Sequence, residues 1–478
     1  MALENPGKQD IKELELSSEE MRALIDLAMD RIVEHIASLP VQPVSDVSGG
    51  EQLARSMAEG MPEQATPFAD LLDLLFHRLV PKSYNTASPG YLAYIPGGGL
   101  FHAAVADLIA DSVNRYVTVW AAAPALAQLE ANVLRWFADM IGYPREAQGV
   151  LTTGGSMASF TALVTARRER LPKDFLSGTL YASDQVHHSV IKAALLAGFP
   201  EENVRAIPVD GHFRIRPGAL RTRIADDRRL GLSPFFIVAS AGTTNTGAVD
   251  DLEKLADVAR EERLWLHVDA AYGGFFMLTE RGQKAMRGME RADSVTLDPH
   301  KALFLPYGTG SLLVRDGAAL RRAHTVNADY MPPMQADPDL VDFCLLSPEL
   351  SRDFRGLRVW LPFKLHGAGA FRRSLDEKLD LAQWVTGELR QIPGMEIVAA
   401  PQLSLVAFRL VRAGLDPDQL NDLNRRLLEK VNARQRVFLT ATTLGGRFVL
   451  RICVLSFRTH LDRMRMAVSD IRDAVQEL

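Results

Sequence analysis

The sequence predicts an α/β fold with a mainly parallel central sheet, preceded by a helical arm and followed by a small α+β domain. Between residues 149 and 314, short apolar segments alternate with amphipathic segments of helical period. The apolar segments are nearly continuous, which is typical of strands that are buried on both faces of a parallel sheet. We therefore expect helices to cover both faces of this sheet.

The elements of the arm come first. Residues 21–36 carry apolar side chains at helical spacing, directly after a helix-start signal over residues 17–20. A second helix is predicted over residues 68–79, which Pro81 ends. We assign residues 1–100 to this N-terminal helical arm.

The large domain is predicted over residues 101–350, and the small α+β domain over residues 351–478. A helix is predicted over residues 126–141, ahead of the strand–helix alternation. The strands expected there cover residues 179–181, 204–208, 235–239, 264–268, 294–297 and 310–314, with helices at 189–196, 220–225 and 252–260. The small domain is expected to contain helices at 357–371, 375–389, 417–431 and 461–475, with strands at 403–410 and 448–454.

The composition excludes several classes of protein. The chain has 478 residues and a formal net charge of −5, without a Lys/Arg block that could follow a phosphate backbone, so we expect no nucleic-acid partner. The longest apolar stretch, residues 117–126, is shorter than the roughly 20 residues that a membrane helix needs, so we expect no membrane span. The polar N-terminus has no signal-peptide pattern, and only Cys344 and Cys453 occur. These features favour the cytoplasm.

Four polar segments follow predicted strands, at the sheet edge where α/β proteins bind ligands. The first contains Gly154, Gly155 and Ser156 and opens an Ala- and Leu-rich helix. Glycines allow close approach of a ligand, and the helix start offers free N–H groups to an anion such as a cofactor phosphate. The alternative interpretation is an ordinary Gly/Ser helix cap.

The second segment, residues 181–189, contains His187 and His188. An imidazole can stack on a flat heteroaromatic ring and can also transfer protons. Adjacent histidines do not share a helix face, and no cysteine or acidic cluster stands at ligand spacing, so we expect no metal site. The alternative for His187 is a solvated histidine at a helix start.

The third segment places Asp269 at the end of a buried apolar strand. A carboxylate in such a position is costly unless it meets a cation. A protonated pyridine nitrogen is such a cation, and the carboxylate raises the pKa of that nitrogen. A helix-capping or metal-binding aspartate is the alternative when this segment is considered alone.

The fourth segment, residues 298–301, has the sequence Asp-Pro-His-Lys and ends in Lys301. We expect burial and neighbouring cations to lower the pKa of this lysine enough for it to form a Schiff base. Alone, Lys301 would be interpreted as a solvated surface charge. Together, the phosphate turn, the ring-stacking histidine, the nitrogen-pairing aspartate and the lysine predict an enzyme that binds pyridoxal 5'-phosphate (PLP).

With these residues identified, the chain resembles the group II PLP-dependent decarboxylases, the family of aromatic-L-amino-acid, histidine and glutamate decarboxylases. The resemblance extends from about Tyr91 to the C-terminus and is most specific in residues 267–272 and 298–301, with further similarity in 120–124 and 183–187. It implies the aspartate-aminotransferase-like fold (fold type I), built as a homodimer with active sites at the interface. The implied cofactor-binding residues are Lys301, Asp269, His187, Ala271 on the opposite ring face, Thr244 in the ring pocket, and Gly155, Ser156 and His300 around the phosphate.

The resemblance also implies a reaction. The family carries on a mobile loop a tyrosine that protonates Cα after CO₂ leaves, and Tyr330 stands at the similar place; members with phenylalanine there tend to be aldehyde synthases. Catalytic roles are therefore expected for Lys301, His187 and Tyr330, in the α-decarboxylation of an L-amino acid. A tyrosine in a surface loop is the alternative for Tyr330.

The sequence leaves alternatives for both the reaction and the substrate. The other reactions to consider are aldehyde synthesis, transamination and another lyase reaction, and a non-enzymatic alternative is an inactive scaffold with this fold. Aromatic amino acids are the first expectation for the substrate, and acidic ones the second. The run Gly97 to Gly99 replaces side chains in a segment that resembles a substrate-pocket wall, which suggests a larger pocket or a more mobile loop. Arg355 resembles a residue near the site, but a helix-surface position is expected for it.

Overall fold

The structure, a computed structural model, describes residues 14–326 and 329–478. The chain divides into two compact units, residues 1–88 and residues 89–478. In the described part of the first unit, α1 (Ser18–Ser38) starts at Ser17, whose side chain accepts from the Glu20 N–H in a capping box. It is followed by α2 (Gly50–Ser56), α3 (Phe68–Asp73), the π-helical turn Leu74–Leu79 and the 3₁₀ turn Val80–Lys82. The expected boundaries at residues 100 and 350 stay predictions.

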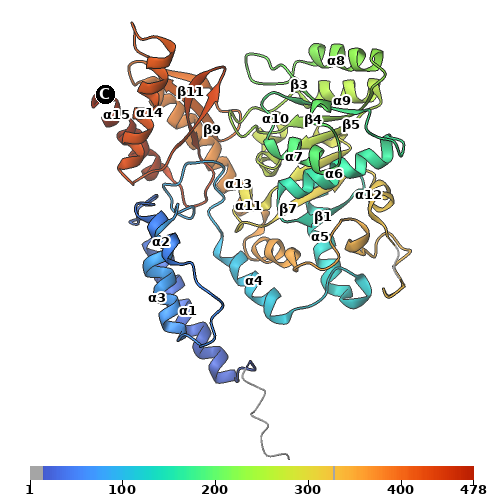
Figure 1. The fold of residues 1–478 in the computed structure, drawn as a ribbon, viewed down its shortest axis with the longest axis horizontal. Coiled ribbons are helices and arrows are strands. Elements are labelled where there is room, and N and C mark those ends of the chain that lie inside the picture. The colour runs from blue at the N-terminus through green and yellow to red at the C-terminus, as the bar shows by residue number, and fades with distance from the viewer. Residues whose placement is uncertain (1–13, 327–328) are drawn as a thin grey trace, which may run out of the picture. The chain divides into compact units, whose positions relative to one another are not determined.

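The second unit contains a seven-stranded mixed sheet in the order β1-β7-β6-β5-β4-β2-β3 (Figure 1). Its strands are β1 (Gln148–Thr152), β2 (Gly178–Ser183), β3 (Val204–Ile207), β4 (Ser233–Ser240), β5 (Trp265–Asp269), β6 (Ser294–Leu297) and β7 (Gly310–Val314). The strand β7 is antiparallel to both β1 and β6, whereas the pairs β6–β5, β5–β4, β4–β2 and β2–β3 are parallel. All strands except β7 therefore end at the same edge, and the predicted mainly parallel α/β fold is confirmed.

Helices connect and cover this sheet. The connecting helices are α4 (Phe101–Val113), α5 (Pro124–Ile141), α6 (Gly155–Arg170), α7 (His188–Leu196), α8 (Pro217–Arg229), α9 (Leu252–Glu262), α10 (Glu280–Ala285), α11 (Pro299–Ala302) and α12 (Gly317–His324). The helix α6 packs along β4 to β7, and α8 and α9 pack against β4 and neighbouring strands. Each of the seven strands contributes buried apolar residues to one core. These strands are buried because their sequences are nearly continuous runs of apolar residues.

The C-terminal part of the second unit has its own four-stranded antiparallel sheet, in the order β10-β11-β9-β8. Its strands are β8 (Met395–Ala399), β9 (Leu405–Leu410), β10 (Thr440–Leu444) and β11 (Arg447–Cys453), and the helices α14 (Pro417–Ala433) and α15 (Leu461–Gln476) complete it. This sheet and its helices enclose a separate apolar core. An α+β arrangement was predicted for this part of the chain.

The long element α13 (Arg355–Arg390) corrects two expectations. We expected two helices with a break after residue 371, but the break lies at Gly367, whose φ of 68° and ψ of 156° interrupt the helical backbone. The predicted surface position of Arg355 is wrong, because this residue is only 4% exposed. Its Nη1 atom donates to the carbonyl oxygen of Leu151, and its guanidinium pairs with Glu349 and Asp353. Arg355 thus joins the start of α13 to β1.

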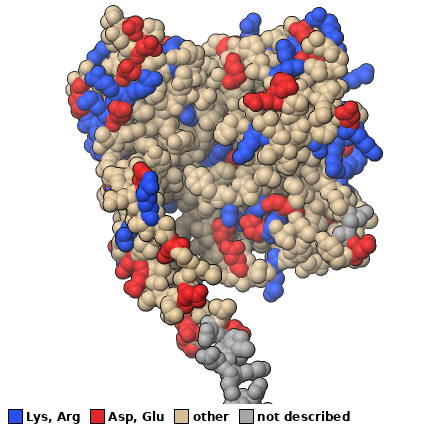
Figure 2. All heavy atoms as spheres, viewed as in Figure 1, with Lys and Arg blue, Asp and Glu red and all other residues tan. Residues whose placement is uncertain are grey.

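Figure 2 shows acidic and basic side chains interspersed over the described residues of the face in view. Among residues 14–326 and 329–478, no helix is both long enough and apolar enough to cross a bilayer.

Candidate active site

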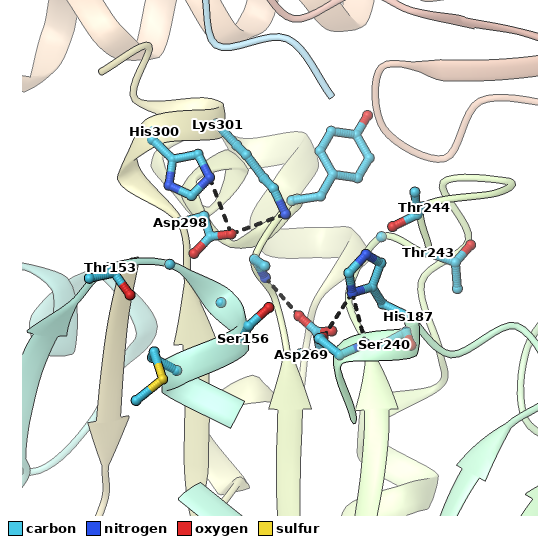
Figure 3. A pocket seen from close by; sticks show the side chains of 17 residues that line it. Thr153, Ser156, His187, Ser240, Thr243, Thr244, Asp269, Asp298, His300 and Lys301 are labelled. Carbon is cyan, nitrogen blue, oxygen red and sulfur yellow. Dashed lines mark hydrogen bonds and ion pairs between the residues drawn. The ribbon is translucent and has the colours of Figure 1, made fainter. Parts of the chain in front are cut away.

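A cavity of about 330 Å³ lies where β1, β2, β4, β5 and β6 end. Every residue predicted to bind the cofactor lines this cavity, namely Gly155, Ser156, His187, Thr244, Asp269, Ala271, His300 and Lys301. Figure 3 shows the labelled side chains projecting into a shared space from these neighbouring elements. Residues that are up to 146 positions apart in the chain, Gly155 and Lys301, are brought together because parallel strands end at one edge of the sheet.

The start of α6 forms one end of the cavity. Gly154, at φ 154°, precedes the helix, and the first-turn residues Gly155, Ser156 and Met157 all line the cavity. A Cβ atom at Gly155 would lie 3.0 Å from Oδ2 of Asp298 and 3.3 Å from Cβ of Ala271. Glycine therefore keeps the space that a side chain would fill, beside a helix N-terminus suited to an anion.

Lys301 lies on the short helix α11, directly after β6. Its Nζ atom is 3.0 Å from Oδ2 of Asp298. Burial lowers the pKa of Lys301, but the carboxylates of Asp298 and Asp269 raise it, and the net shift is upward. The expectation that neighbouring cations lower this pKa is therefore wrong, because the nearest charged partners are carboxylates.

His300 is oriented by the loop before β7. Its Nδ1 atom is 2.6 Å from the carbonyl oxygen of Thr309, which can only accept, so Nδ1 carries the hydrogen. Its Nε2 atom lies 3.7 Å from Oδ2 of Asp298. The side chain of Thr309 in turn accepts from Arg358, which pairs with Asp107. This chain of contacts fixes the orientation of the imidazole in the cavity.

Asp269 is the last residue of β5. His187 lies at the end of the loop that connects β2 to α7. One oxygen of Asp269 accepts from the backbone N–H of Ala271 at 3.2 Å. His187 caps α7, and its Nδ1 atom accepts from the N–H of Ser189 at 3.3 Å and lies 2.8 Å from Oγ of the same residue. Burial lowers the pKa of His187, although the charge of Asp269 opposes this shift. A neutral imidazole with its hydrogen on Nε2 presents a flat face to a ring.

Tyr330 is not among the residues that line the cavity. It follows α12 in a turn, and it is 79% exposed. The preceding Asn327 and Ala328 lie outside the described residues. The structure thus brings together the predicted cofactor residues without the predicted proton donor.

The glycines at 97–99 have a different role from the one we expected. A Cβ atom at Gly97 would overlap the backbone carbonyl oxygen of His300, and one at Gly98 would lie 2.6 Å from Oγ of Ser456. The N–H of the next residue, Leu100, donates to the carbonyl oxygen of Phe304 at 2.7 Å. The lack of side chains therefore lets this segment pack directly on the turn that carries Lys301, and does not by itself indicate a larger pocket.

Sequence reasoning missed several residues of the cavity. Asp298 was quoted in the lysine segment without a role, yet its side chain lines the cavity and is buried. Because Asp298 is in the same short segment as His300 and Lys301, its sequence position alone could have indicated that it lines the same cavity. The remaining lining residues without a predicted role, Thr153, Gly154, Met157, Ser189, Ser240, Gly242, Thr243 and Tyr272, are adjacent to predicted ones or follow β4.

The residues of the cavity fit PLP in their chemistry. The glycine turn at the start of α6 leaves space beside helix amides for a phosphate, and the Lys301 amine can hold an aldehyde covalently. Asp269 supplies a carboxylate for a ring nitrogen and His187 a neutral imidazole for a ring face.

Comparisons with known proteins agree with this fit. An aromatic-L-amino-acid decarboxylase of Bacillus atrophaeus is 36% identical over 97% of this chain and 97% of its own length. The crystal structure of Oryza sativa TDC with PLP and tryptamine has a TM-score of 0.92, is 29% identical, and matches 97% of this chain and 99% of that chain. The crystal structure of Rhodiola rosea 4-hydroxyphenylacetaldehyde synthase has a TM-score of 0.90 at 26% identity, over 97% of this chain and 99% of that chain.

The pyridoxal-dependent decarboxylase conserved domain matches residues 51–411. The match covers most of the chain, including β1 to β7 and the whole cavity. The fold, the cavity and this match together show that the chain belongs to the pyridoxal-dependent decarboxylase family and is a PLP-dependent amino acid decarboxylase.

Proposed function

We propose that this protein removes the α-carboxylate of an aromatic L-amino acid as CO₂ and releases the amine. The observation that carries the proposal is the convergence of Lys301, Asp269 and His187 in one cavity whose opposite end is the glycine turn of α6. The aromatic substrate class is supported by the Bacillus atrophaeus relative, whose printed name is aromatic-L-amino-acid decarboxylase.

Each residue of the cavity has a proposed task. PLP, when bound, supplies an electron sink for the electrons that remain after CO₂ leaves. Lys301 would hold the cofactor covalently through its side-chain amine. Asp269 would keep a proton on the pyridine nitrogen through charge attraction, which favours the transfer of electrons into the ring. His187 and Ala271 would contact the ring faces, Gly155, Ser156 and His300 would bind the phosphate, and Thr244 would line the ring pocket.

We further propose that Tyr330 donates the proton that replaces the carboxylate on Cα, relayed through His187. An exposed tyrosine outside the cavity of its own chain can reach a substrate by closure of its loop or from a second subunit. We favour a homodimer with active sites at the interface. In support, α1 has no buried residue and its Met21 is 50% exposed, which is typical of a surface that another chain covers.

We also propose a cytoplasmic location, in keeping with Cys344 and Cys453, which are both free thiols.

A second candidate function is aldehyde synthesis, because the Rhodiola rosea enzyme with this fold is a 4-hydroxyphenylacetaldehyde synthase. The presence of Tyr330, rather than phenylalanine, favours simple decarboxylation. A panel of aromatic and acidic L-amino acids, with CO₂, amine, ammonia and peroxide measured together, tests both candidates. We expect CO₂ and amine in equal amounts from an aromatic substrate. Ammonia and peroxide in amounts equal to CO₂ would overturn simple decarboxylation, and turnover of acidic substrates alone would overturn the substrate class.

A further inference from the structure

The carboxylate of Asp298 lines the cavity beside the start of α6, where the helix N–H groups suit an anion. Its side chain is 2% exposed, and its Oδ1 atom is buried without a hydrogen-bond partner in the described part of the chain. Its Oδ2 atom would lie 3.0 Å from a Cβ at Gly155, in the first turn of α6. An anion bound in the space that the missing side chain leaves would lie beside this carboxylate. Two neighbouring anionic groups repel each other unless one of them carries a proton.

The charged and titratable groups around Asp298 determine which of its oxygen atoms already has a partner. Lys301 and His300 approach from α11, with Nζ at 3.0 Å and Nε2 at 3.7 Å from Oδ2. Asp269 at the end of β5 and His187 before α7 interact electrostatically with this cluster, and Cys453 of β11 interacts with Lys301. The start of α6 adds the positive end of a helix dipole. Among the described residues, the Lys301 ammonium pairs with Oδ2, and no hydrogen-bond donor reaches Oδ1.

Attachment of the cofactor weakens the strongest of these contacts. The Lys301 ammonium condenses with the aldehyde, a C=N bond replaces the C=O bond, and two N–H hydrogens leave with the aldehyde oxygen as water. The Lys301 nitrogen keeps one hydrogen at most and loses most of its capacity to donate to Asp298. Asp298 therefore loses a donor as the phosphate arrives beside it.

We propose that the carboxyl group of Asp298 and the cofactor phosphate share one proton, so that this protein takes up a proton when it binds PLP. Oδ1 of Asp298 then gains the donor that it lacks. The consequence is a cofactor affinity that falls as the pH rises. The inference rests on the cofactor and not on the proposed substrate, so a failure of one leaves the other standing.

The test is a titration of the cofactor-free protein with PLP, followed by tryptophan fluorescence between pH 6 and pH 9, for the wild type and the Asp298→Asn variant. Uptake of one proton predicts a wild-type Kd that rises by up to about tenfold per pH unit in the alkaline range. In Asp298→Asn the amide can donate to the phosphate without a proton from solvent, so we expect a nearly constant Kd that is tighter than wild type at pH 9. The ³¹P NMR signal of the bound phosphate should titrate in the wild type and stay at the dianion position in the variant.

Two controls separate this effect from a loss of structure. Asp293 lies directly before β6 and is a partly buried carboxylate, but it accepts from the N–H of Leu266 and does not line the cavity. Asp293→Asn should keep the wild-type pH dependence of Kd. If Asp298→Asn folds poorly, Asp298→Ser provides a second neutral side chain. A wild-type phosphate signal that is dianionic at every pH, or a neutral variant that binds PLP more weakly at pH 9, would overturn the proposal.

Discussion

The cavity and the loop after α12 contribute to the same proposed reaction, but their residues are held in different ways. Lys301, Asp269 and His187 follow strands of one buried sheet and line one cavity. Tyr330 lies in a turn, is 79% exposed and does not line that cavity. The ends of the strands and the helix starts beside them assemble the cavity. The proposed delivery of a proton by Tyr330, in contrast, would need a movement of this residue or a second subunit. Substitutions in the cavity and at Tyr330 should therefore have different effects.

The largest expected effect is on the sheet side. In Lys301→Ala, the covalent link to PLP cannot form, so we expect loss of the visible absorption band of the lysine-bound cofactor and a fall in CO₂ release by several orders of magnitude. Absorption spectroscopy and a CO₂ assay check this. Lys254 is a suitable control because it is exposed and pairs with Asp251 outside the cavity. A lysine-bound absorption band that survives in Lys301→Ala would contradict the role of Lys301.

On the loop side, Tyr330→Phe should leave the cofactor spectrum unchanged and lower amine formation by roughly 10²–10⁴-fold, the usual contribution of a general acid. Ammonia, peroxide and aldehyde should be measured with the amine, since loss of the proton donor favours the oxygen-dependent reaction. Tyr84→Phe, in the N-terminal unit, is the control substitution. Full amine formation by Tyr330→Phe would remove Tyr330 from the mechanism.

Mixing the two variants decides whether the loop acts within its own chain. If Tyr330 serves the cavity of a second subunit, a mixed dimer of Lys301→Ala and Tyr330→Phe chains contains one complete site. Random exchange of subunits should then restore about a quarter of the wild-type activity, as expected for a two-fold symmetric dimer. No recovery, with dimer exchange shown independently, would mean that Tyr330 acts on its own chain.

The smallest expected effect concerns the sheet beneath the cavity. His267 of β5 is fully buried, and burial lowers its pKa to about 4. As the pH falls from 6.5 towards 4, the unfolded chain binds a proton that the folded chain does not, so the folded state loses up to about 3 kcal/mol of stability. In His267→Asn we expect lower stability at pH 7 but a smaller further loss on acidification.

Urea unfolding midpoints between pH 7 and pH 4.5 check this expectation. Asp250 acts in the opposite direction, because burial raises its pKa to about 6 and the folded chain gains stability as this carboxyl is protonated. That contribution is common to both proteins and cancels in the comparison. Parallel pH profiles for the wild type and His267→Asn would contradict the assignment.

Much of this protein could be predicted without coordinates. The strands expected over residues 235–239, 264–268 and 294–297 match β4, β5 and β6 within a few residues, because buried parallel strands are apolar and short. The placement of Lys301 and Asp269 in one cavity could also be predicted, since each stands at the end of a strand in one parallel sheet. Their chemical roles stay predictions. The strand β8 was missed, in keeping with its only partly buried side chains.

The amino-acid sequence by itself determined the α/β class and the cofactor, and it predicted residues that line one cavity, because local hydrophobic pattern and residue chemistry are properties of short segments. Only the tertiary structure decided the antiparallel direction of β7, the burial of Arg355 and the packing of Gly97 on His300. It also decided that Lys301 faces carboxylates and that Asp298 meets the start of α6. These properties depend on distances between segments far apart in the chain, which the pattern within one segment does not contain.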